Sequence, residues 1–230
     1  MRATAGEVGA AFDPGIRATM TEDLTDFPPE AFAKYDTSPD PAFYAQPRFV
    51  THIDAGAIAA LTELYKEIVP AGGDILDLMS SWVSHLPDGV AYASVTGHGL
   101  NATELAANTR LDRSFVQDLN AEPRLPLQAG SMDAALMCVS VQYLQRPVAV
   151  LSEVARVLRP GAPVVISFSN RCFPTKAVAI WNALDGTGHA QLVGLYCQRA
   201  GFSRIETRVL KAGGGRGDPM TAVIARTAIA

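Results

Sequence analysis

The residues best able to do chemistry in this chain lie between Ile75 and Leu86, where an apolar run passes through Asp77 into a polar turn. Many cofactor-binding folds place a glycine-rich turn at such a point, because glycine lets the backbone bend closely against a ligand. Here no glycine follows, and Ser80 and Ser81 stand in the turn instead. Their hydroxyl and amide groups can donate hydrogen bonds to a carboxylate. The stretch therefore predicts a ligand site of unusual construction.

The histidines do not indicate a metal site. His52, His85, His98 and His189 lack the spacing of a metal-ligand pair, and no H-x-E or H-E-x-x-H motif occurs. His85 is either a catalytic residue that faces an acceptor pocket or a loop residue satisfied by backbone groups. The nearby Trp82 either lines a ligand cavity or packs under a helix.

Composition restricts the class of protein. The chain has 230 residues, 48% of them hydrophobic, which is enough for one α/β domain with its own core. The net charge of −4 is spread without acidic or basic blocks, so we expect no nucleic-acid partner and no membrane partner. A small-molecule substrate suits this surface better. The sequence indicates no oligomeric state.

The cysteines and the N-terminal composition favour a cytoplasmic protein. Cys138, Cys172 and Cys197 are an odd number at wide spacing, so they cannot form a complete disulfide framework. Residues 1–30 lack the order of a signal peptide, and no apolar run approaches the roughly 20 residues that a membrane span requires.

Two segments are expected along the chain. Residues 1–53 form an N-terminal arm that is broken by prolines, and residues 54–230 form the α/β domain, which opens with a helix capped by Asp54. The end of the arm is dense in aromatic and polar side chains. Tyr44, Arg48 and His52 there belong either to a lid over a site or to a strap packed on the first helix.

A strand-then-helix rhythm predicts a parallel sheet with helices on both faces. Two further strand-like runs, separated by a glycine-rich loop, predict a terminal hairpin. The expected fold class is thus α/β, a three-layer Rossmann-like sandwich whose mostly parallel seven-stranded sheet ends in an antiparallel hairpin. The expected strands are 75–78, 91–95, 114–117, 132–140, 163–169, 204–211 and 220–226, and helices are expected after Asp54, over 102–108 and over 148–158.

Two stretches resemble the class I S-adenosylmethionine-dependent methyltransferases of the methyltransferase type 11 kind. Residues 130–144, GSMDAALMCVSVQYL, are similar to the family's fourth strand and the polar pair after it. Residues 153–161, EVARVLRPG, are similar to the helix and turn that follow. The resemblance extends over 54–230 and implies S-adenosylmethionine as cofactor, lying across the carboxyl ends of the first strands.

The resemblance also implies cofactor contacts. Asp77 matches the acidic end of the family's first strand, and Asp118 matches the acidic residue near the adenine amino group, with Leu119 over the purine face. Asp118 capping a local turn is the alternative. The implied cofactor-binding residues are Asp77, Met79, Ser80, Ser81, Asn101, Asp118 and Leu119.

The sequence departs from the family pattern at two places. Met79, Ser81 and Val83 stand where the family has glycines, which predicts a different backbone path or a shallower cofactor. Gly99 stands where the family has a carboxylate for the ribose hydroxyls, so Asn101 or Glu104 would have to replace it.

The resemblance places the substrate near the end of the fourth strand. Gln142 and Tyr143 match residues beside the transferred methyl and are, with His85, the candidate catalytic residues. Asn170 and Arg171 follow the fifth strand on the same rim. The alternatives are a core aromatic for Tyr143 and a surface ion pair for Arg171. The candidate substrate and lid residues are Tyr44, Arg48, His52, Trp82, Asn170 and Arg171.

Methyl transfer from a sulfonium needs an in-line approach rather than a metal or a covalent enzyme intermediate. The function implied by the resemblance is S-adenosylmethionine-dependent methyl transfer to a small-molecule acceptor. The alternative is a catalytically inactive protein of methyltransferase fold with a binding or regulatory role.

Overall fold

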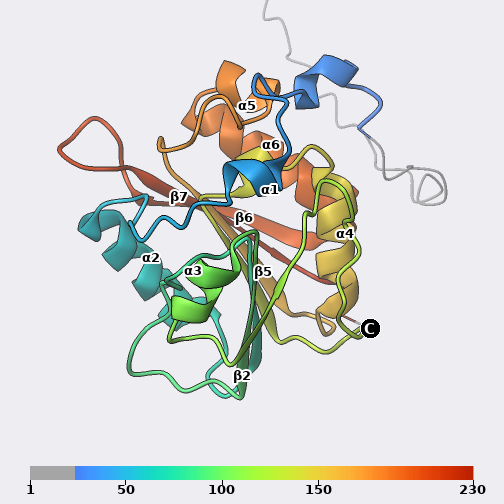
Figure 1. Ribbon diagram of the computed structural model, residues 1–230. Helices are drawn as coiled ribbons and strands as arrows, with labels where there is room; N and C mark the ends of the chain where they lie inside the picture. The colour runs from blue at the N-terminus through green and yellow to red at the C-terminus, as the bar shows by residue number, and fades with distance from the viewer. Residues whose placement is uncertain (1–23, 230) are drawn as a thin grey trace, which may run out of the picture.

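A computed structural model describes residues 24–229 as a seven-stranded sheet with helices on both faces (Figure 1). The strand order is β3-β2-β1-β4-β5-β7-β6. Strands β1 to β5 are parallel, and β7 runs antiparallel to both β5 and β6. The expected mostly parallel sheet with an antiparallel terminal hairpin is confirmed.

Strands and helices alternate after an irregular arm. The strands are β1 (Asp74–Leu78), β2 (Ser94–Gly99), β3 (Arg113–Val116), β4 (Ala134–Cys138), β5 (Pro163–Phe168), β6 (Ser203–Lys211) and β7 (Met220–Arg226). The helices are α1 (Asp40–Phe43), α2 (Ala55–Ile68), α3 (Ala102–Ala107), α4 (Pro147–Val157), α5 (Ala179–Ala183) and α6 (Gly186–Arg199), with short 3-10 turns η2 (Pro29–Phe32) and η3 (Val141–Tyr143). In this part of the chain no helix has both the length and the apolar character to cross a bilayer.

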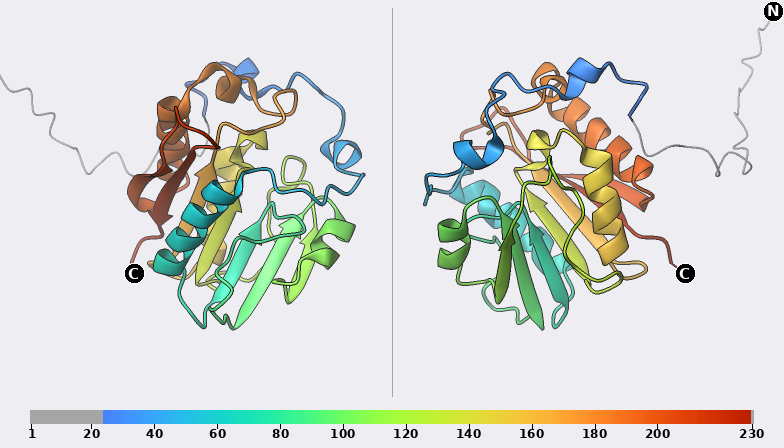
Figure 2. Two further views of the ribbon diagram at one scale, coloured as in Figure 1. Left: turned by 90° about the vertical axis from the view of Figure 1, so that its left-hand side faces the viewer. Right: turned by 45° about the vertical axis from the view of Figure 1, so that its right-hand side comes forward.

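The central strands separate two apolar layers, because successive side chains of a strand point to opposite faces. Leu76 of β1 belongs to the layer that contains Leu151 of α4 and Tyr196 of α6. Its neighbour Ile75 belongs to the layer that contains Leu61 of α2. Figure 2 shows α2 on one side of the sheet and α4 with α6 on the other. This arrangement leaves the carboxyl edge of the parallel strands free for a site.

Strand β2 was expected at 91–95, and this prediction is wrong by several residues, since the strand runs over Ser94–Gly99. Gly97 and Gly99 suggest a turn, but both lie in the strand, and neighbouring groups leave no room for a side chain at either position. A Cβ on Gly97 would lie 2.3 Å from Leu111 Cδ1, and one on Gly99 would lie 2.5 Å from the Ser80 carbonyl oxygen. Close packing, rather than flexibility, accounts for both glycines.

Two further differences come from tertiary structure. Strand β4 is shorter than the expected 132–140, because the backbone leaves the strand at Val139, where φ is +43°. Helix α6 was not predicted, since Gly186, Gly188 and Gly194 interrupt its pattern. It is held by burial of one face against the core rather than by propensity, as is usual for helices of this length.

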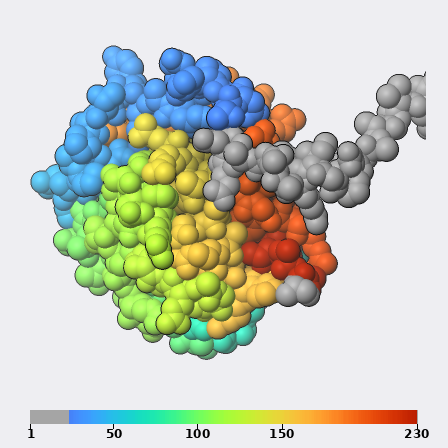
Figure 3. Space-filling view, turned by 90° about the vertical axis from the view of Figure 1, so that its right-hand side faces the viewer, coloured from blue at the N-terminus to red at the C-terminus, as the bar shows by residue number. Residues whose placement is uncertain are grey.

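The described part of the arm is fixed to the domain by buried charges. The Nζ atom of Lys176, whose side chain is fully buried, lies 3.4 Å from carboxylate oxygens of both Asp36 and Asp40. Lys34 Nζ also contacts Asp40, at 2.5 Å. Lys176 comes after β5, so these contacts join the arm to a segment far along the chain. In the space-filling view, the arm in blue follows the upper margin of the molecule (Figure 3).

We retain the division into an arm (1–53) and a domain (54–230) as a proposal. Residues 1–23 of this arm lie outside the described residues. The arm from Lys34 to Asp40 is anchored by ion pairs that are expensive to break, because loss of one partner leaves a buried charge without compensation.

Candidate functional site

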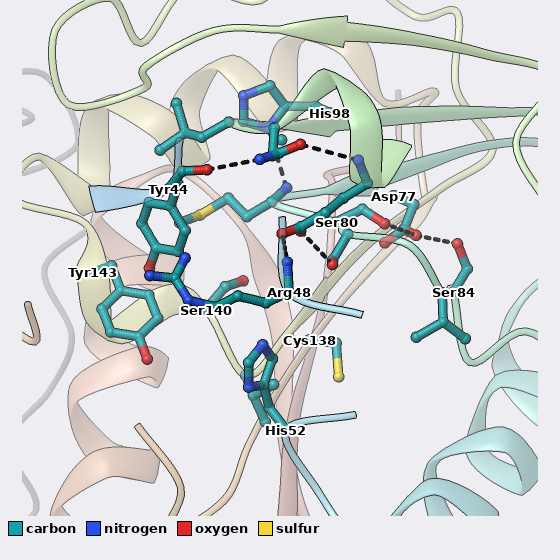
Figure 4. A pocket seen from close by; sticks show the side chains of 18 of the residues that line it. Tyr44, Arg48, His52, Asp77, Ser80, Ser84, His98, Cys138, Ser140 and Tyr143 are labelled. Carbon is teal, nitrogen blue, oxygen red and sulfur yellow. Dashed lines mark hydrogen bonds between the residues drawn. The ribbon is translucent and has the colours of Figure 1, made fainter. Parts of the chain in front are cut away.

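A cavity of about 290 Å³ lies over the carboxyl ends of β1, β2, β3 and β4 and is roofed by the arm. This is the general ligand position of an open α/β sheet, at the point where the strand order reverses between β1 and β4. Figure 4 shows side chains from the strand ends and from the arm converging on this space. The volume is at the lower end of the range for small-ligand pockets.

The turn after β1 keeps a left-handed backbone without glycine. Met79 has φ +55°, a conformation that glycine adopts freely and that other residues adopt at a cost of roughly 1–2 kcal/mol. Its amide N–H donates to Nδ1 of His98 at 3.1 Å, and the Ser80 N–H donates to the His98 carbonyl at 2.6 Å. The turn is therefore held by β2.

His98 is a buried, neutral clip between three strand ends. Its Nδ1 accepts from Met79, so its Nε2 carries the proton and donates to the Gln117 carbonyl at 2.8 Å. Burial lowers the pKa of His98 to about 4, against the opposing effect of the bond to Gln117. The uncharged ring is thus the stable form near neutral pH.

Asp77 lies at the floor of the cavity and is bound by two serines. Ser80 Oγ donates to its Oδ2 at 2.6 Å, and Ser84 Oγ donates to the same oxygen. Burial raises the pKa of Asp77 to about 6, although the two hydroxyls act in the opposite direction. The Ser80 hydroxyl therefore serves the protein's own carboxylate in this structure.

Asn101, which was expected to contact a ribose, is engaged by the protein itself. The Asn101 Oδ1 caps α3 by accepting from the N–H groups of Thr103 and Glu104, and its Nδ2 donates to the carbonyls of Tyr44 and Ala45. Every hydrogen-bonding group of this side chain is engaged.

Glu104 is the carboxylate beside this position. It is 7% exposed and lines the cavity, where its two oxygens accept from the Ser81 hydroxyl at 2.6 Å and the Arg48 N–H at 2.7 Å. A carboxylate has about four acceptor directions, so Glu104 can accept further hydrogen bonds.

Asp118 and Leu119 line the cavity beyond β3. Asp118 Oδ1 accepts from the Asn120 N–H at 2.9 Å, so the local turn considered for this residue is present. The turn uses one carboxylate oxygen, which leaves the second for another donor. Leu119 is 4% exposed.

The end of β4 presents Ser140 and Tyr143 to the cavity. The Ser140 hydroxyl is buried and, within residues 24–229, has no hydrogen-bond partner. The Tyr143 hydroxyl accepts from the Phe173 N–H at 2.9 Å. Burial raises the pKa of Tyr143 to about 12, while the bond from Phe173 acts against this rise. Tyr143 therefore remains a hydrogen-bond donor.

The arm contributes Tyr44, Arg48 and His52 to the cavity wall, as Figure 4 shows. The Arg48 guanidinium lies over the rings of Phe43 and Phe173, at 4.7 Å and 5.5 Å from their centroids. His52 and His85 also line the cavity, and the walls around each ring lower its pKa by keeping water away. Both are neutral at pH 7 as a result.

Three of the expected site residues lie outside the cavity lining. Gln142 is buried beneath it and donates to the Val139 carbonyl at 2.8 Å. Trp82 donates to the Val50 carbonyl at 3.1 Å and packs edge-on against Phe49, so it holds the arm. Asn170 is exposed on the rim.

Arg171 reaches the cavity but is paired with Asp218 at 2.8 Å. Among the described residues no cluster of potential metal ligands occurs.

Comparison with known proteins also points to this part of the chain. The sequence profile of the methyltransferase domain family matches residues 80–166, starting directly after the turn at Met79. Residues 80–166 therefore match a methyltransferase domain, and the strand order is that of the Rossmann-like methyltransferase fold. No curated protein matches the sequence.

Solved structures share the fold of this methyltransferase domain. One is a complex of the Haloferax volcanii Trm112 methyltransferase activator with a putative methyltransferase, at TM-score 0.59 and 14% identity over 76% of this chain and 90% of that chain. Another is an S-adenosylmethionine-dependent methyltransferase from Aquifex aeolicus, at 0.55 and 18% over 74% and 90%. The cyclase SpnF matches at 0.56 and 16% over 74% and 81%. At these identities the likeness establishes the fold.

Sequence reasoning missed several residues of the methyltransferase domain's cavity. His98 was noted only as a histidine without metal spacing, and its position between two glycines of β2 was the available signal. Ser84 lies four residues after Ser80, and this spacing was a weaker signal. Ser140 and Phe173 have no local signal, because only the fold brings them to the cavity.

The left-handed conformation of Met79 predicts that glycine is more stabilising than alanine at this position, the reverse of the usual order. Met79→Gly and Met79→Ala both remove the side chain, but only glycine relieves the positive φ. We expect Met79→Gly to be more stable than Met79→Ala by about 1 kcal/mol, measured by urea unfolding. The same pair at Leu78, inside β1, should show the ordinary order with alanine ahead. Alanine ahead at both positions contradicts the assigned turn.

The buried neutral His98 predicts acid sensitivity of the fold. The pKa of His98 is about 4 when folded and 6.5 when exposed, so the unfolded chain binds the proton more readily between these values and acid destabilises the fold. We expect the stability advantage of the native protein over His98→Asn to shrink by about 3 kcal/mol from pH 6.5 to pH 4. Taking the difference cancels the opposing contribution of Asp77. Urea unfolding of both proteins across this pH range measures the difference in stability. A difference that does not change with pH contradicts a buried, neutral His98.

Proposed function

We propose that this protein transfers a methyl group from S-adenosylmethionine to a small-molecule acceptor. The observation that carries the proposal is the cavity itself, which remains open over the strand ends although the glycine-rich turn is absent. Met79 adopts a left-handed conformation that glycine would adopt freely, and its side chain packs against the apolar core. The floor is therefore open enough for a nucleoside.

Polar groups of the cavity support the proposal at the adenine and ribose ends of the cofactor. Asp118 keeps one carboxylate oxygen for the adenine amino group, with Leu119 as the apolar neighbour. Glu104, rather than the saturated Asn101, is the acceptor that we assign to the ribose hydroxyls. When bound, S-adenosylmethionine supplies an electrophilic methyl group on a sulfonium.

The chain's own residues would position the acceptor and manage its proton. Tyr143 stays protonated because of its raised pKa, so its hydroxyl orients an acceptor by donating to it. His52 and His85 are neutral and line the same cavity, so either can take a proton from a hydroxyl acceptor. Gln142 supports the turn at Val139 and leaves the chemistry to these residues.

A second function is favoured by one observation. The position of the usual ribose carboxylate cannot be restored, since a side chain at Gly99 would meet the Ser80 carbonyl at 2.5 Å. A protein of this fold that no longer transfers methyl groups and instead binds or regulates would tolerate this change. The structure named as a cyclase shows that the fold is not restricted to proteins named for methyl transfer. We propose a cytoplasmic location for either function.

Calorimetry with S-adenosylmethionine and S-adenosylhomocysteine tests the proposed function. Both ligands should bind with micromolar affinity, and Asp118→Asn should weaken each about tenfold, the value of roughly one hydrogen bond to a charged group. The asparagine retains an oxygen for the Asn120 N–H and so keeps the turn. It places an amide where the carboxylate would accept from adenine.

Asp112→Asn is the matched control, because Asp112 also accepts from a backbone N–H, that of Val95 at 2.7 Å, but lies outside the cavity lining. Binding of neither ligand to the native protein would replace the transferase proposal with the binding or regulatory one.

A further inference from the structure

The cavity wall contains a half-buried arginine, Arg48, with a buried donor that is not used. Arg48 Nη2 donates to the Phe43 carbonyl at 2.9 Å, but Nη1 is buried and has no hydrogen-bond partner within residues 24–229. A buried polar atom without a partner costs free energy, and a charged one costs more. Such an atom in the wall of a ligand cavity indicates that the ligand provides the partner.

The protein's own carboxylates do not meet this need. Glu104 accepts from the Ser81 hydroxyl and from the backbone N–H of Arg48, but not from the Arg48 guanidinium. Asp40 is taken by Lys34, Lys176 and Asn120. The second arginine of the cavity, Arg171, differs because it is paired with Asp218 and its side chain is 63% exposed.

Aromatic rings hold the guanidinium in place. Its central carbon lies 4.7 Å from the Phe43 ring centroid, 5.6 Å from that of Tyr44 and 5.5 Å from that of Phe173. Stacking of this kind restricts the planar group and keeps water from its faces, which leaves its edge for hydrogen bonding. Figure 4 shows Arg48 reaching into the pocket beside Tyr44.

A second unused group lines the same cavity. The Ser140 hydroxyl is buried without a partner, and it follows Val139, a β-branched residue with φ +43°. Strain at such a residue persists only where the surroundings enforce it, and it is commonly found at ligand sites. Here the strained residue turns the chain from β4 into the cavity wall.

We propose that Arg48 and Ser140 form an anion subsite that binds a carboxylate of the ligand. A planar carboxylate matches the edge of a guanidinium and accepts from a hydroxyl at the same time. The hydroxyls of Ser80 and Ser81, which the sequence offered for this role, already donate to Asp77 and Glu104. The carboxylate is that of the cofactor's amino-acid end, an assignment that rests on the proposed function, or that of an acceptor.

Calorimetry with three probes separates these sources. S-adenosylhomocysteine carries the amino-acid carboxylate, 5′-methylthioadenosine is the matching nucleoside without it, and benzoate is a simple aromatic carboxylate. The variants are Arg48→Met, Arg48→Lys, which keeps the charge and loses the fork, and Ser140→Ala. Arg110→Met is the control, because Arg110 also has a buried unpartnered nitrogen and lies over a ring, that of Tyr92, but outside the cavity.

A cofactor carboxylate predicts that Arg48→Met weakens S-adenosylhomocysteine at least tenfold and 5′-methylthioadenosine less than twofold. Arg48→Lys should lie between, Ser140→Ala should lose a few-fold, and Arg110→Met should lose nothing. An acceptor carboxylate predicts that both nucleosides are unaffected while benzoate binding is lost in Arg48→Met. Either result supports the subsite.

Equal binding of all three probes by the native protein and Arg48→Met overturns the subsite while leaving the proposed function intact. Failure of the native protein to bind either nucleoside overturns the proposed function instead. In that case the benzoate measurement tests the subsite. Benzoate binding that is lost in Arg48→Met supports the subsite, and a native protein that does not bind benzoate overturns it. Arg48→Lys keeps the test valid if the methionine variant fails to fold.

Discussion

The hydrogen bond from the Met79 N–H to Nδ1 of His98 determines the shape of the whole site. It holds a left-handed residue directly after β1, where glycine would adopt this conformation without cost. The histidine also binds the end of β3 through Gln117, so one side chain sets the relative positions of three strand ends. The turn can then remain open above the sheet without a flexible glycine loop.

This construction explains why so many polar groups are buried at the floor. Asp77, Ser80 and Ser84 form one hydrogen-bonded group under the turn, and Glu104, Ser81 and the arm form a second beside it. Satisfied networks of this kind stiffen a site, because each member fixes the orientation of the next. The hydroxyls of Ser80, Ser81 and Ser84 bind carboxylates of the protein, whereas Arg48 Nη1 and the Ser140 hydroxyl are among the cavity donors left without a partner.

The sequence predicted the architecture well because its signals are local. Apolar runs, the Asp54 cap and the glycine-rich hairpin loop each act within a few residues, and they gave the strands, α2 and the antiparallel end. Asp77 lies near the end of β1 and Asp118 comes two residues after β3, so their place at the cavity could be expected.

The remainder depends on contacts between distant segments. Glu104 meets Arg48 across 56 positions of sequence, and Lys176 reaches Ser38 across 138. Gly97 and Gly99 misled the strand prediction because the groups that exclude their side chains lie on other elements. Gln142 and Tyr143 are adjacent in sequence, yet only the second faces the cavity, since the short turn after β4 sends them in different directions.

The central claim is that a glycine-free turn, clipped by a neutral histidine, leaves a working nucleoside cavity. A crystal structure with S-adenosylhomocysteine tests it most directly. The account predicts the adenine beside Asp118, the ribose hydroxyls on Glu104, and Met79 still left-handed and bonded to His98. Density for the ligand elsewhere, or a Met79 side chain occupying the cavity, would contradict it.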